Sequence, residues 1–325
     1  MKLVLINCYF GVLPNYFELW LQSCEANPQV DFILITDAKI STYIPKNIKI
    51  IHTTFDKLVR KIDTKFRFKI SITSPYKLTD FKPAYGYIFY DLIAPYDYWG
   101  YCDLDLIFGN IMKFIEKPMQ QGFDKIYRLG HLTIYKNTEK MRKLFSQKGG
   151  MFSYREVFSN PEFYSFDEHA GQMLIAKKQK VNEYYQEDMA DISCRLNRLT
   201  ASRHKNYPLQ VFYYEEGAVY RAYLSDGNIK TDEYVYIHIQ KRKYNYSFKY
   251  KSFIIMSDKI MPLNDQMVSL SMIKKYSEYV SDEVDREQVQ KHHLKKISEF
   301  LKCSIREKRI WLRIKGAEIC YSKMK

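Results

Sequence analysis

The chain has 325 residues, a formal net charge of +14 and a hydrophobic share of 46%, and its length fits one large α/β domain with an appendage, or two domains. No stretch reaches the roughly 18 apolar residues that span a bilayer, and the start lacks the length and cleavage site of a signal peptide. The six cysteines include no Cys-x-x-Cys pair, which argues against a zinc site or a disulfide framework. We therefore expect a cytoplasmic protein, free or peripherally attached at the inner face of the cell membrane.

The first part of the chain predicts alternating strands and helices. Short apolar runs, rich in β-branched residues, predict strands, and apolar residues at helical spacing predict the helices between them. The order of these predicted elements indicates that the chain begins with a βαβ unit. The predicted strands are 3–7, 31–36, 48–52, 126–135 and 235–239, the predicted helices are 15–24, 54–63, 140–148 and 167–178 with a further helix within 79–95, and 210–214 with 219–223 forms a hairpin.

Two carboxylates, Asp103 and Asp105, follow an aromatic strand and precede an apolar stretch and a glycine turn. In an extended chain, side chains at i and i+2 lie on one face, so the two carboxylates would repel each other unless a cation lies between them. Oxygen ligands suit Mg²⁺ or Mn²⁺, which can hold a diphosphate. The alternative is one structural Asp that caps a turn and one exposed Asp.

The strand that ends in Thr36-Asp37, the Asp-Leu-Asp triplet, the segment 76–86 with Asp-Phe-Lys-Pro, and the segment 236–241 together resemble GT-A-fold nucleotide-sugar glycosyltransferases with a DxD motif, of the bacterial type that builds capsular or exopolysaccharide. The resemblance covers about residues 1–245. It implies an α/β, Rossmann-like GT-A fold, with a mixed central sheet flanked by helices. We expect residues 1–265 to form the catalytic domain and residues 266–325 to form a basic helical C-terminal extension.

The resemblance also implies an activity. The expected enzyme uses Mn²⁺ or Mg²⁺ and moves a hexose from a UDP-sugar (galactose, glucose or galactofuranose) to a sugar hydroxyl of a growing, lipid-linked surface polysaccharide. Two other classes stay open from the residues alone. Paired Asp residues also occur in metal-dependent phosphohydrolases and nucleotidyltransferases, and the positive charge would suit a nucleic-acid-binding protein, although no nucleic-acid-binding module is visible.

The donor is expected at the carboxyl ends of the strands, where ligands bind in open α/β sheets. By resemblance, the loop of Tyr9, Phe10 and Gly11 would line the base, and Asp37 would contact uracil or ribose. The local alternative is that Gly11 makes a turn and Asp37 caps the next helix.

Asp80 and Lys82 stand before a proline, in a segment where either side chain could touch the nucleotide. They could equally mark a helix start, with Asp80 as the cap and Pro83 in the first turn.

By resemblance, His238 would complete a metal site with Asp103 and Asp105, and Asp103 would also contact the nucleotide-sugar. Lys241 and Arg242 follow that histidine and would stabilise the departing phosphate. A histidine in an apolar strand can also be a buried core residue without any ligand.

Glu168 and Asp167 are the candidate catalytic residues, because a carboxylate there could deprotonate the acceptor hydroxyl if the reaction inverts. The alternative is an acidic first turn that complements a helix dipole. His131 and Asp191 are candidates for binding the acceptor.

The last 40 residues, 286–325, hold 12 Lys or Arg and 4 Glu, together with apolar residues that partly follow helical spacing. Such a basic amphipathic tail predicts binding to an anionic membrane surface, where a lipid-linked acceptor would be found. The alternative is a helix that packs on the catalytic domain with a solvated basic face.

Overall fold

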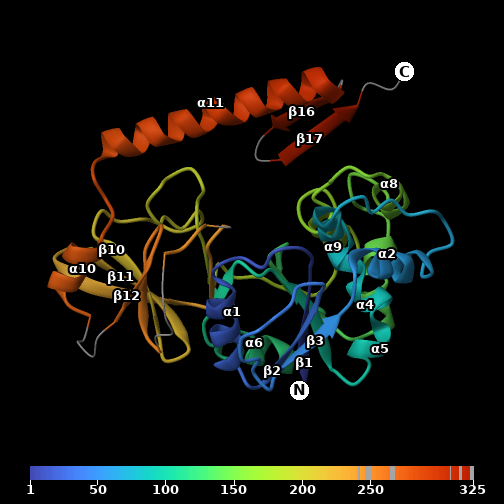
Figure 1. The fold of residues 1–325 in the computed structure, drawn as a ribbon, viewed down its shortest axis with the longest axis horizontal. Coiled ribbons are helices and arrows are strands. Elements are labelled where there is room, and N and C mark those ends of the chain that lie inside the picture. The colour runs from blue at the N-terminus through green and yellow to red at the C-terminus, as the bar shows by residue number, and fades with distance from the viewer. Residues whose placement is uncertain (241, 246–250, 264–267, 308, 315–316, 323–325) are drawn as a thin grey trace.

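The computed structural model describes the chain except residues 241, 246–250, 264–267, 308, 315–316 and 323–325, and for residues 299–325 it describes the helix and strands but not the side chains. A seven-stranded mixed sheet, in the order β3-β2-β1-β4-β7-β6-β8, forms the centre (Figure 1). Strands β3, β2, β1 and β4 run parallel, and β7 runs antiparallel to both its neighbours. The strands are β1 (Leu3–Tyr9), β2 (Val30–Thr36), β3 (Ile48–His52), β4 (Tyr98–Cys102), β6 (Lys125–Leu129), β7 (Leu132–Lys136) and β8 (Glu183–Tyr184).

Helices cover both faces of this sheet. Successive side chains of its parallel strands point to opposite faces, and the side chains on both faces are apolar, so both faces are covered. Leu3 and Leu5 face α1 (Phe17–Glu25) and α6 (Ile111–Gln120). Val4 and Ile6 face α2 (Phe55–Asp63) and a series of short helices. That series and the later helices are η1 (Pro75–Lys77), α3 (Leu78–Phe81), η2 (Lys82–Ala84), α4 (Tyr85–Ile88), α5 (Tyr90–Ile93), α7 (Glu139–Arg142), η3 (Leu144–Ser146), α8 (Tyr154–Ser159) and α9 (Gln172–Lys178). The predicted mixed sheet flanked by helices is confirmed.

A three-stranded sheet brings distant residues to the end of β4. Its order is β5-β13-β9, and these strands are β5 (Leu106–Phe108), β13 (Tyr236–His238) and β9 (Met189–Asp191). Strand β5 directly follows the Asp-Leu-Asp sequence of residues 103–105, called the Asp triplet below. In the register of these strands, His238 lies opposite both Leu106 and Asp191. The predicted late strand therefore delivers His238 next to Asp105.

A five-stranded sheet, in the order β12-β11-β10-β14-β15, lies beside the central sheet, and α10 (Leu270–Tyr276) packs on it through Ile273. Its strands are β10 (Gln210–Glu215), β11 (Ala218–Ser225), β12 (Asn228–Tyr234), β14 (Phe253–Ile255) and β15 (Ile260–Pro262).

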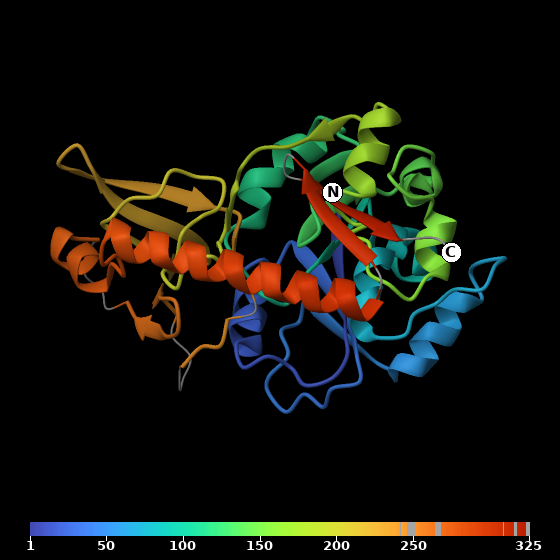
Figure 2. The same cartoon turned by 90° about the horizontal axis from the view of Figure 1, so that it is seen from above.

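The C-terminal part begins with α11 (Asp282–Glu307), which starts above the five-stranded sheet and crosses the molecule toward the central sheet (Figures 1 and 2). At its start, Arg198 donates to Asp285 at 3.0 Å. Strands β16 (Arg309–Ile314) and β17 (Ala317–Ser322) then form an antiparallel pair, so this end of the expected helical extension is a hairpin. Within the described residues, no helix combines the length and apolar character that crossing a membrane requires. The domain boundary at residue 265 stays a prediction.

Four other elements differ from the sequence prediction. The helix predicted over 140–148 is divided into α7 and η3. Residues 126–135, predicted as one strand, form the hairpin β6–β7, which turns at Gly130-His131. The predicted helix within 79–95 is divided into short turns, because Pro83 cannot donate a backbone N–H. The helix predicted from residue 167 begins at Gln172, so the acidic pair 167–168 lies in the turn before it.

A buried ion pair fixes the segment around residue 80. Lys77 donates to Asp80 at 2.8 Å, and both side chains are shielded from water. Asp80 also accepts the backbone N–H groups of Tyr164 and Phe166 at 3.0 and 2.9 Å. Burial raises the pKa of Asp80, while the charge of Lys77 opposes that rise. The pair therefore ties η1 and α3 to the loop that leads into Asp167.

We expect Lys77→Met to lower the free energy of unfolding by about 3–5 kcal/mol, because it leaves the Asp80 carboxylate buried without a cation. Urea unfolding followed by circular dichroism measures this loss. The double variant Lys77→Met with Asp80→Asn should recover much of it, since no buried charge remains. Lys57→Met, on the exposed side of α2, is the control, with an expected change within about 0.5 kcal/mol. Equal effects of both lysine variants would refute this account.

Candidate functional site

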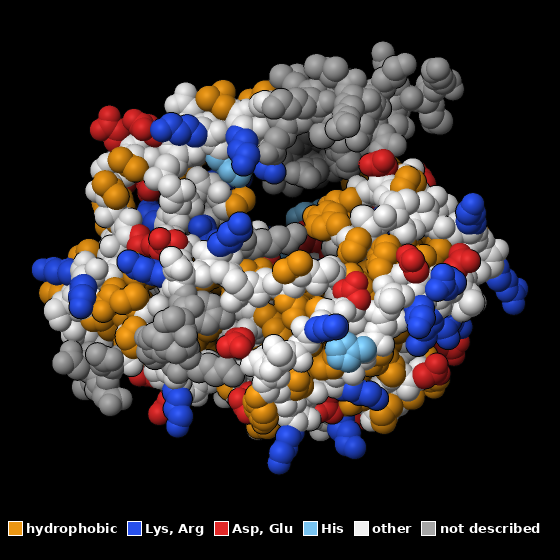
Figure 3. Space-filling view, viewed as in Figure 1, with side chains coloured by type: hydrophobic (Ala, Val, Ile, Leu, Met, Phe, Trp, Pro, Cys, Tyr) orange, Lys and Arg blue, Asp and Glu red, His pale blue; other side chains and the backbone are white. Residues whose placement is uncertain are grey.

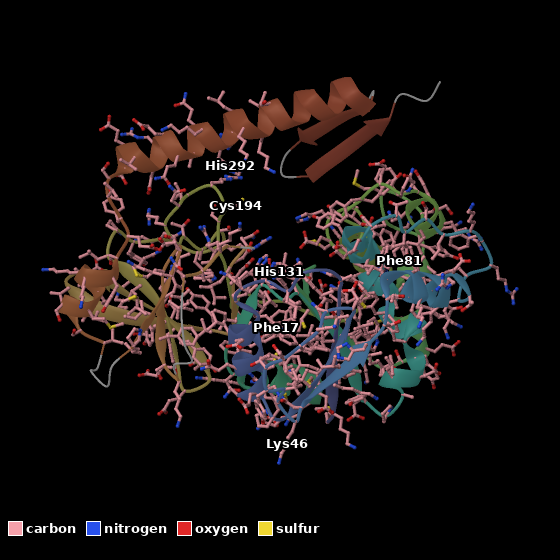
Figure 4. The ribbon with its side chains drawn as sticks, in the orientation of Figure 1. Phe17, Lys46, Phe81, His131, Cys194 and His292 are labelled. Carbon is pink, nitrogen blue, oxygen red and sulfur yellow. The ribbon has the colours of Figure 1, made fainter. Side chains whose placement is uncertain are left out.

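A cavity of about 900 Å³ opens at the carboxyl ends of β1 and β4. This is the edge at which open α/β sheets bind their ligands. Figure 3 shows a hollow near the middle of this face with hydrophobic side chains at its edge, and His131 lies at the middle of the molecule in Figure 4. The lining residues come from six segments of the chain: 7–16, 75–85, 102–105, 130–131, 163–168 and 238–243.

The Asp triplet lies on this wall as a turn between β4 and β5, not as the extended chain expected from the sequence. Its two carboxylates therefore have separate cationic partners. Lys82 Nζ lies 2.6 Å from Asp103 Oδ1, and His238 Nε2 lies 3.4 Å from Asp105 Oδ2. The repulsion anticipated between the carboxylates is relieved by two different cations.

Lys82 joins the Asp triplet to the predicted catalytic pair. Its Nζ also donates to the Gly130 carbonyl at 2.9 Å and lies 3.6 Å from Asp167 Oδ2. Burial lowers the pKa of Lys82, but the carboxylates of Asp103 and Asp167 outweigh it, so the net pKa rises. Burial raises the pKa of Asp167 well above its usual range, because Lys82 is closer to Asp103 and compensates Asp167 only in part.

Glu168 is the more accessible member of the acidic pair. Its Oε1 accepts the Gly130 backbone N–H at 2.6 Å, and its side chain is partly exposed. Gly130 permits this approach, since a Cβ there would lie 2.3 Å from Asp167 Oδ2 and 2.9 Å from Glu168 Cγ. The hairpin turn and the acidic turn therefore fit against each other only with glycine at position 130.

Three further side chains gather around His238. Asp191 Oδ1 lies 2.9 Å from His238 Nδ1, and the Gln240 amide donates to the same carboxylate at 3.0 Å. The His131 ring stacks on the His238 ring, with centroids 4.3 Å apart. Burial lowers the pKa of His238, yet Asp105 and Asp191 raise it to about 10 overall.

This cluster has the donor atoms of a divalent-metal site. One ligand atom each from His131, Asp191 and His238 lies within 4.8 Å of the others. Imidazole nitrogen and carboxylate oxygen together suit Mn²⁺ and related ions, which would take over the neutralisation of Asp105 and Asp191. The structure thus brings Asp105 and His238 together as predicted, adds His131 and Asp191, which were expected at the acceptor, and pairs Asp103 with Lys82.

The loop after β1 is only partly at the cavity. Tyr9 and Phe10 line it, whereas Gly11 and Asp37 do not. Asp37 instead accepts the Gly11 backbone N–H at 2.8 Å, so it shapes the loop. Asp80 is likewise absent from the lining, because it is buried against Lys77.

The basic segment after β13 reaches the cavity through Arg242 and Lys243. The Arg242 guanidinium donates to the Ser193 carbonyl at 3.0 Å and to the carbonyls of Leu196 and Asn197 at 3.2 Å, which holds one loop against the wall. Lys243 is exposed and was not singled out from the sequence. Lys241 lies outside the described residues.

Two features were missed in the sequence, one in the cavity lining and one in the β6–β7 hairpin. Asn7 donates to the Cys102 carbonyl at 2.5 Å, and its buried Oδ1 has no hydrogen-bond partner within the described part of the chain, so it can accept from a ligand. Tyr127 has a φ of 63° at an irregularity in the β6–β7 pairing and donates to Asp188 at 3.0 Å. Such a bulge redirects the strand end that carries His131. A polar residue directly after the apolar run 3–6 was the available signal for Asn7.

The fold and cavity define a mixed α/β protein with a candidate metal centre at the sheet edge. Residues 5–264 match the family described as "Family of unknown function (DUF6625)", and the chain belongs to that family. No curated protein matches the chain.

Among solved structures, the chain is similar to the galactosyltransferase LgtC in complex with donor and acceptor sugar analogs, with 11% identity, a TM-score of 0.33, and coverage of 59% of this chain and 75% of that one. For mouse xyloside xylosyltransferase 1 the identity is 7%, the TM-score 0.35, and the coverage 59% and 88%. For the glycosyltransferase GlyE of Streptococcus pneumoniae TIGR4 the identity is 13%, the TM-score 0.30, and the coverage 57% and 45%. Because these TM-scores and sequence identities are low, the similarity to the three structures does not assign an activity to this chain.

We expect His238→Gln to weaken Mn²⁺ binding at least about 10-fold, because it removes an imidazole ligand from the cluster. Isothermal titration at pH 7 measures the affinity. His169→Gln is the matched control, since this exposed histidine lies near Glu168 and outside the cluster. Unchanged Mn²⁺ affinity in His238→Gln would exclude the cluster as the metal site.

Proposed function

We propose that the protein is a metal-dependent GT-A glycosyltransferase that moves a hexose from a UDP-sugar to a sugar hydroxyl of a growing, lipid-linked surface polysaccharide of the bacterial capsule type. One observation carries the proposal: the Asp triplet, His238 and the Asp167–Glu168 pair, which are far apart in the sequence, line a single cavity. One side of the cavity would hold the diphosphate of a nucleotide-sugar, and the other side would accept the proton of the acceptor hydroxyl. Transfer from a nucleotide-sugar requires both.

The donor side consists of the loop after β1, the Asp triplet and the basic segment after β13. Tyr9 and Phe10 would contact the base, and the buried Asn7 Oδ1 offers an acceptor to the nucleotide. Arg242 and Lys243 would hold the diphosphate. A divalent ion held by His131, Asp191 and His238, with Asp105 beside them, would neutralise charge on the leaving diphosphate.

The reacting side consists of the acidic pair. Glu168 would take the proton of the acceptor hydroxyl, because it is partly exposed, whereas burial raises the pKa of Asp167 and so favours its protonated form. The hydroxyl oxygen forms a bond to the anomeric carbon as the bond from that carbon to the diphosphate breaks. The electron pair of the broken bond leaves with UDP, and the configuration would invert because the hydroxyl attacks from the face opposite the diphosphate.

The lipid-linked acceptor would bring the protein to the inner face of the membrane. Leu294 and Ile297 on α11 are 59% and 54% exposed, beside Lys295 and Lys296, which supports contact with an anionic surface. The other apolar residues of the predicted tail, from Phe300 onward, lie outside the described side chains. Cosedimentation with anionic and neutral vesicles tests this part, and equal recovery with both would refute it.

The donor site is tested by a thermal-shift panel of nucleoside diphosphates with and without Mn²⁺. We expect UDP to stabilise the wild type, by about 2.7 kcal/mol at a hundredfold excess over Kd, and only with Mn²⁺. Asp105→Ala should remove the shift because it removes a metal-side carboxylate. Asp91→Ala, an exposed Asp outside the cavity, should keep it.

Absence of a shift with every nucleotide would refute the proposed donor site. Release of UDP from UDP-sugars at full rate without any acceptor would favour the phosphohydrolase alternative. A shift with UDP that is insensitive to Asp105→Ala would move the site away from the triplet.

The catalytic role of Glu168 is tested with Glu168→Gln. We expect transferase kcat to fall about 10²–10⁴-fold, because the amide cannot accept the hydroxyl proton, while UDP binding stays unchanged. Glu156→Gln, an exposed residue of α8, is the control and should retain full activity. Full activity in Glu168→Gln would remove Glu168 from the mechanism.

A further inference from the structure

Two aromatic rings stand together on the cavity wall beside the acidic pair. Tyr76 and Phe163 line the cavity, and their ring centroids are 4.9 Å apart at an interplanar angle of 54°. Tyr76 is 54% exposed, although large aromatic side chains usually contribute to protein cores. Tyr76 is exposed and Phe163 is half-buried, and such an aromatic pair at a polar cavity is suited to contact a ligand.

The backbone beneath this aromatic pair is fixed by the buried ion pair of Lys77 and Asp80. Lys77, the neighbour of Tyr76, donates to the Val157 carbonyl at 2.9 Å and to the carbonyl of Glu162, the neighbour of Phe163. Asp80 accepts the backbone N–H of Tyr164, on the other side of Phe163. One buried charge pair therefore holds the segments of both rings, so the rings are positioned before any ligand arrives.

The loop that carries Phe163 continues toward the proposed base. Backbone N–H groups of Tyr164 and Phe166 point to Asp80, whereas the alternate residues Phe163, Ser165 and Asp167 line the cavity. Glu168 follows directly. A ligand resting on the rings would therefore have hydroxyl and carboxyl groups next along the same wall.

This arrangement matches the chemistry of a carbohydrate ring. One face of a pyranose consists of C–H groups and packs against aromatic rings, while its edge carries hydroxyl groups that donate to carboxylates and exchange hydrogen bonds with serine. Pockets of this kind combine apolar contact area with a few placed polar groups. A nucleobase could also stack on rings, but Tyr9, Phe10 and Asn7 offer it a place on the separate loop after β1.

We propose that Tyr76 and Phe163 form the acceptor subsite and bind the C–H face of an acceptor sugar ring, with its attacking hydroxyl directed to Glu168. This inference rests on the proposed function. It makes Tyr76 a specificity-determining residue, since the ring selects acceptors by the face that they present.

The test measures methyl glycosides of galactose, glucose and N-acetylglucosamine by saturation-transfer-difference NMR, with the full chain, UDP and Mn²⁺. We expect ring C–H protons to receive saturation from the wild type and Tyr76→Ala to raise the glycoside Kd at least about fivefold, because the stacking partner is lost. Tyr76→Phe should bind as the wild type. Tyr43→Ala, which removes a tyrosine that is 58% exposed outside the cavity, should also bind normally.

UDP binding is measured on the same samples and separates this inference from the proposed function. If UDP binds but no glycoside depends on Tyr76, the subsite is refuted and the donor site stands. If Tyr76→Ala loses UDP and keeps the glycosides, the rings hold the base, which also refutes the inference. Glycoside binding that depends on Tyr76 without any UDP binding supports the subsite and refutes the transferase, whereas binding of neither ligand refutes both.

Discussion

The ammonium group of Lys82 lies in the cavity wall between Asp103 and Asp167, and it also donates a hydrogen bond to the Gly130 carbonyl. Carboxylates removed from water need a cation or donors nearby, or they take up a proton. Each acid at or near the cavity meets this requirement in its own way. Asp80 has Lys77, Asp103 has Lys82, and Asp105 has His238. Asp167 has only a share of Lys82, so burial raises its pKa well above the usual range.

This distribution of charge divides the cavity into two sides with different chemistry. Around His238, two carboxylates converge on one imidazole, which leaves donor atoms suited to a metal ion and to the phosphates that it would hold. Around Gly130, one acid is buried and the other is partly exposed and fixed by a backbone N–H. Lys82 belongs to both sides, so a ligand that binds Asp103 also changes the electrostatic surroundings of Asp167.

The opening strands could be predicted from the sequence because apolar runs are local signals, whereas the mixed sheet was expected from the resemblance to GT-A-fold enzymes. The choice of Asp105 and His238 as metal ligands rested on residue types that suit a metal and on the same resemblance, and it stays a prediction. The sequence could not pair Asp103 with Lys82 or bring Asp191 to His238, since those contacts depend on a turn between β4 and β5 and on the register of β9 with β13. Asp80 illustrates the same limit, because only the fold shows that its partner is Lys77 and that it binds the loop at 164–166.

The Lys77–Asp80 pair has a consequence for how relatives of this chain can diverge. A change at either position alone leaves a charge in the protein interior, so viable sequences must alter both positions together. An apolar pair would still leave the N–H groups of Tyr164 and Phe166 without their acceptor. Positions 77 and 80 should therefore covary within the family, whereas the two rings whose segments they support are under no such constraint.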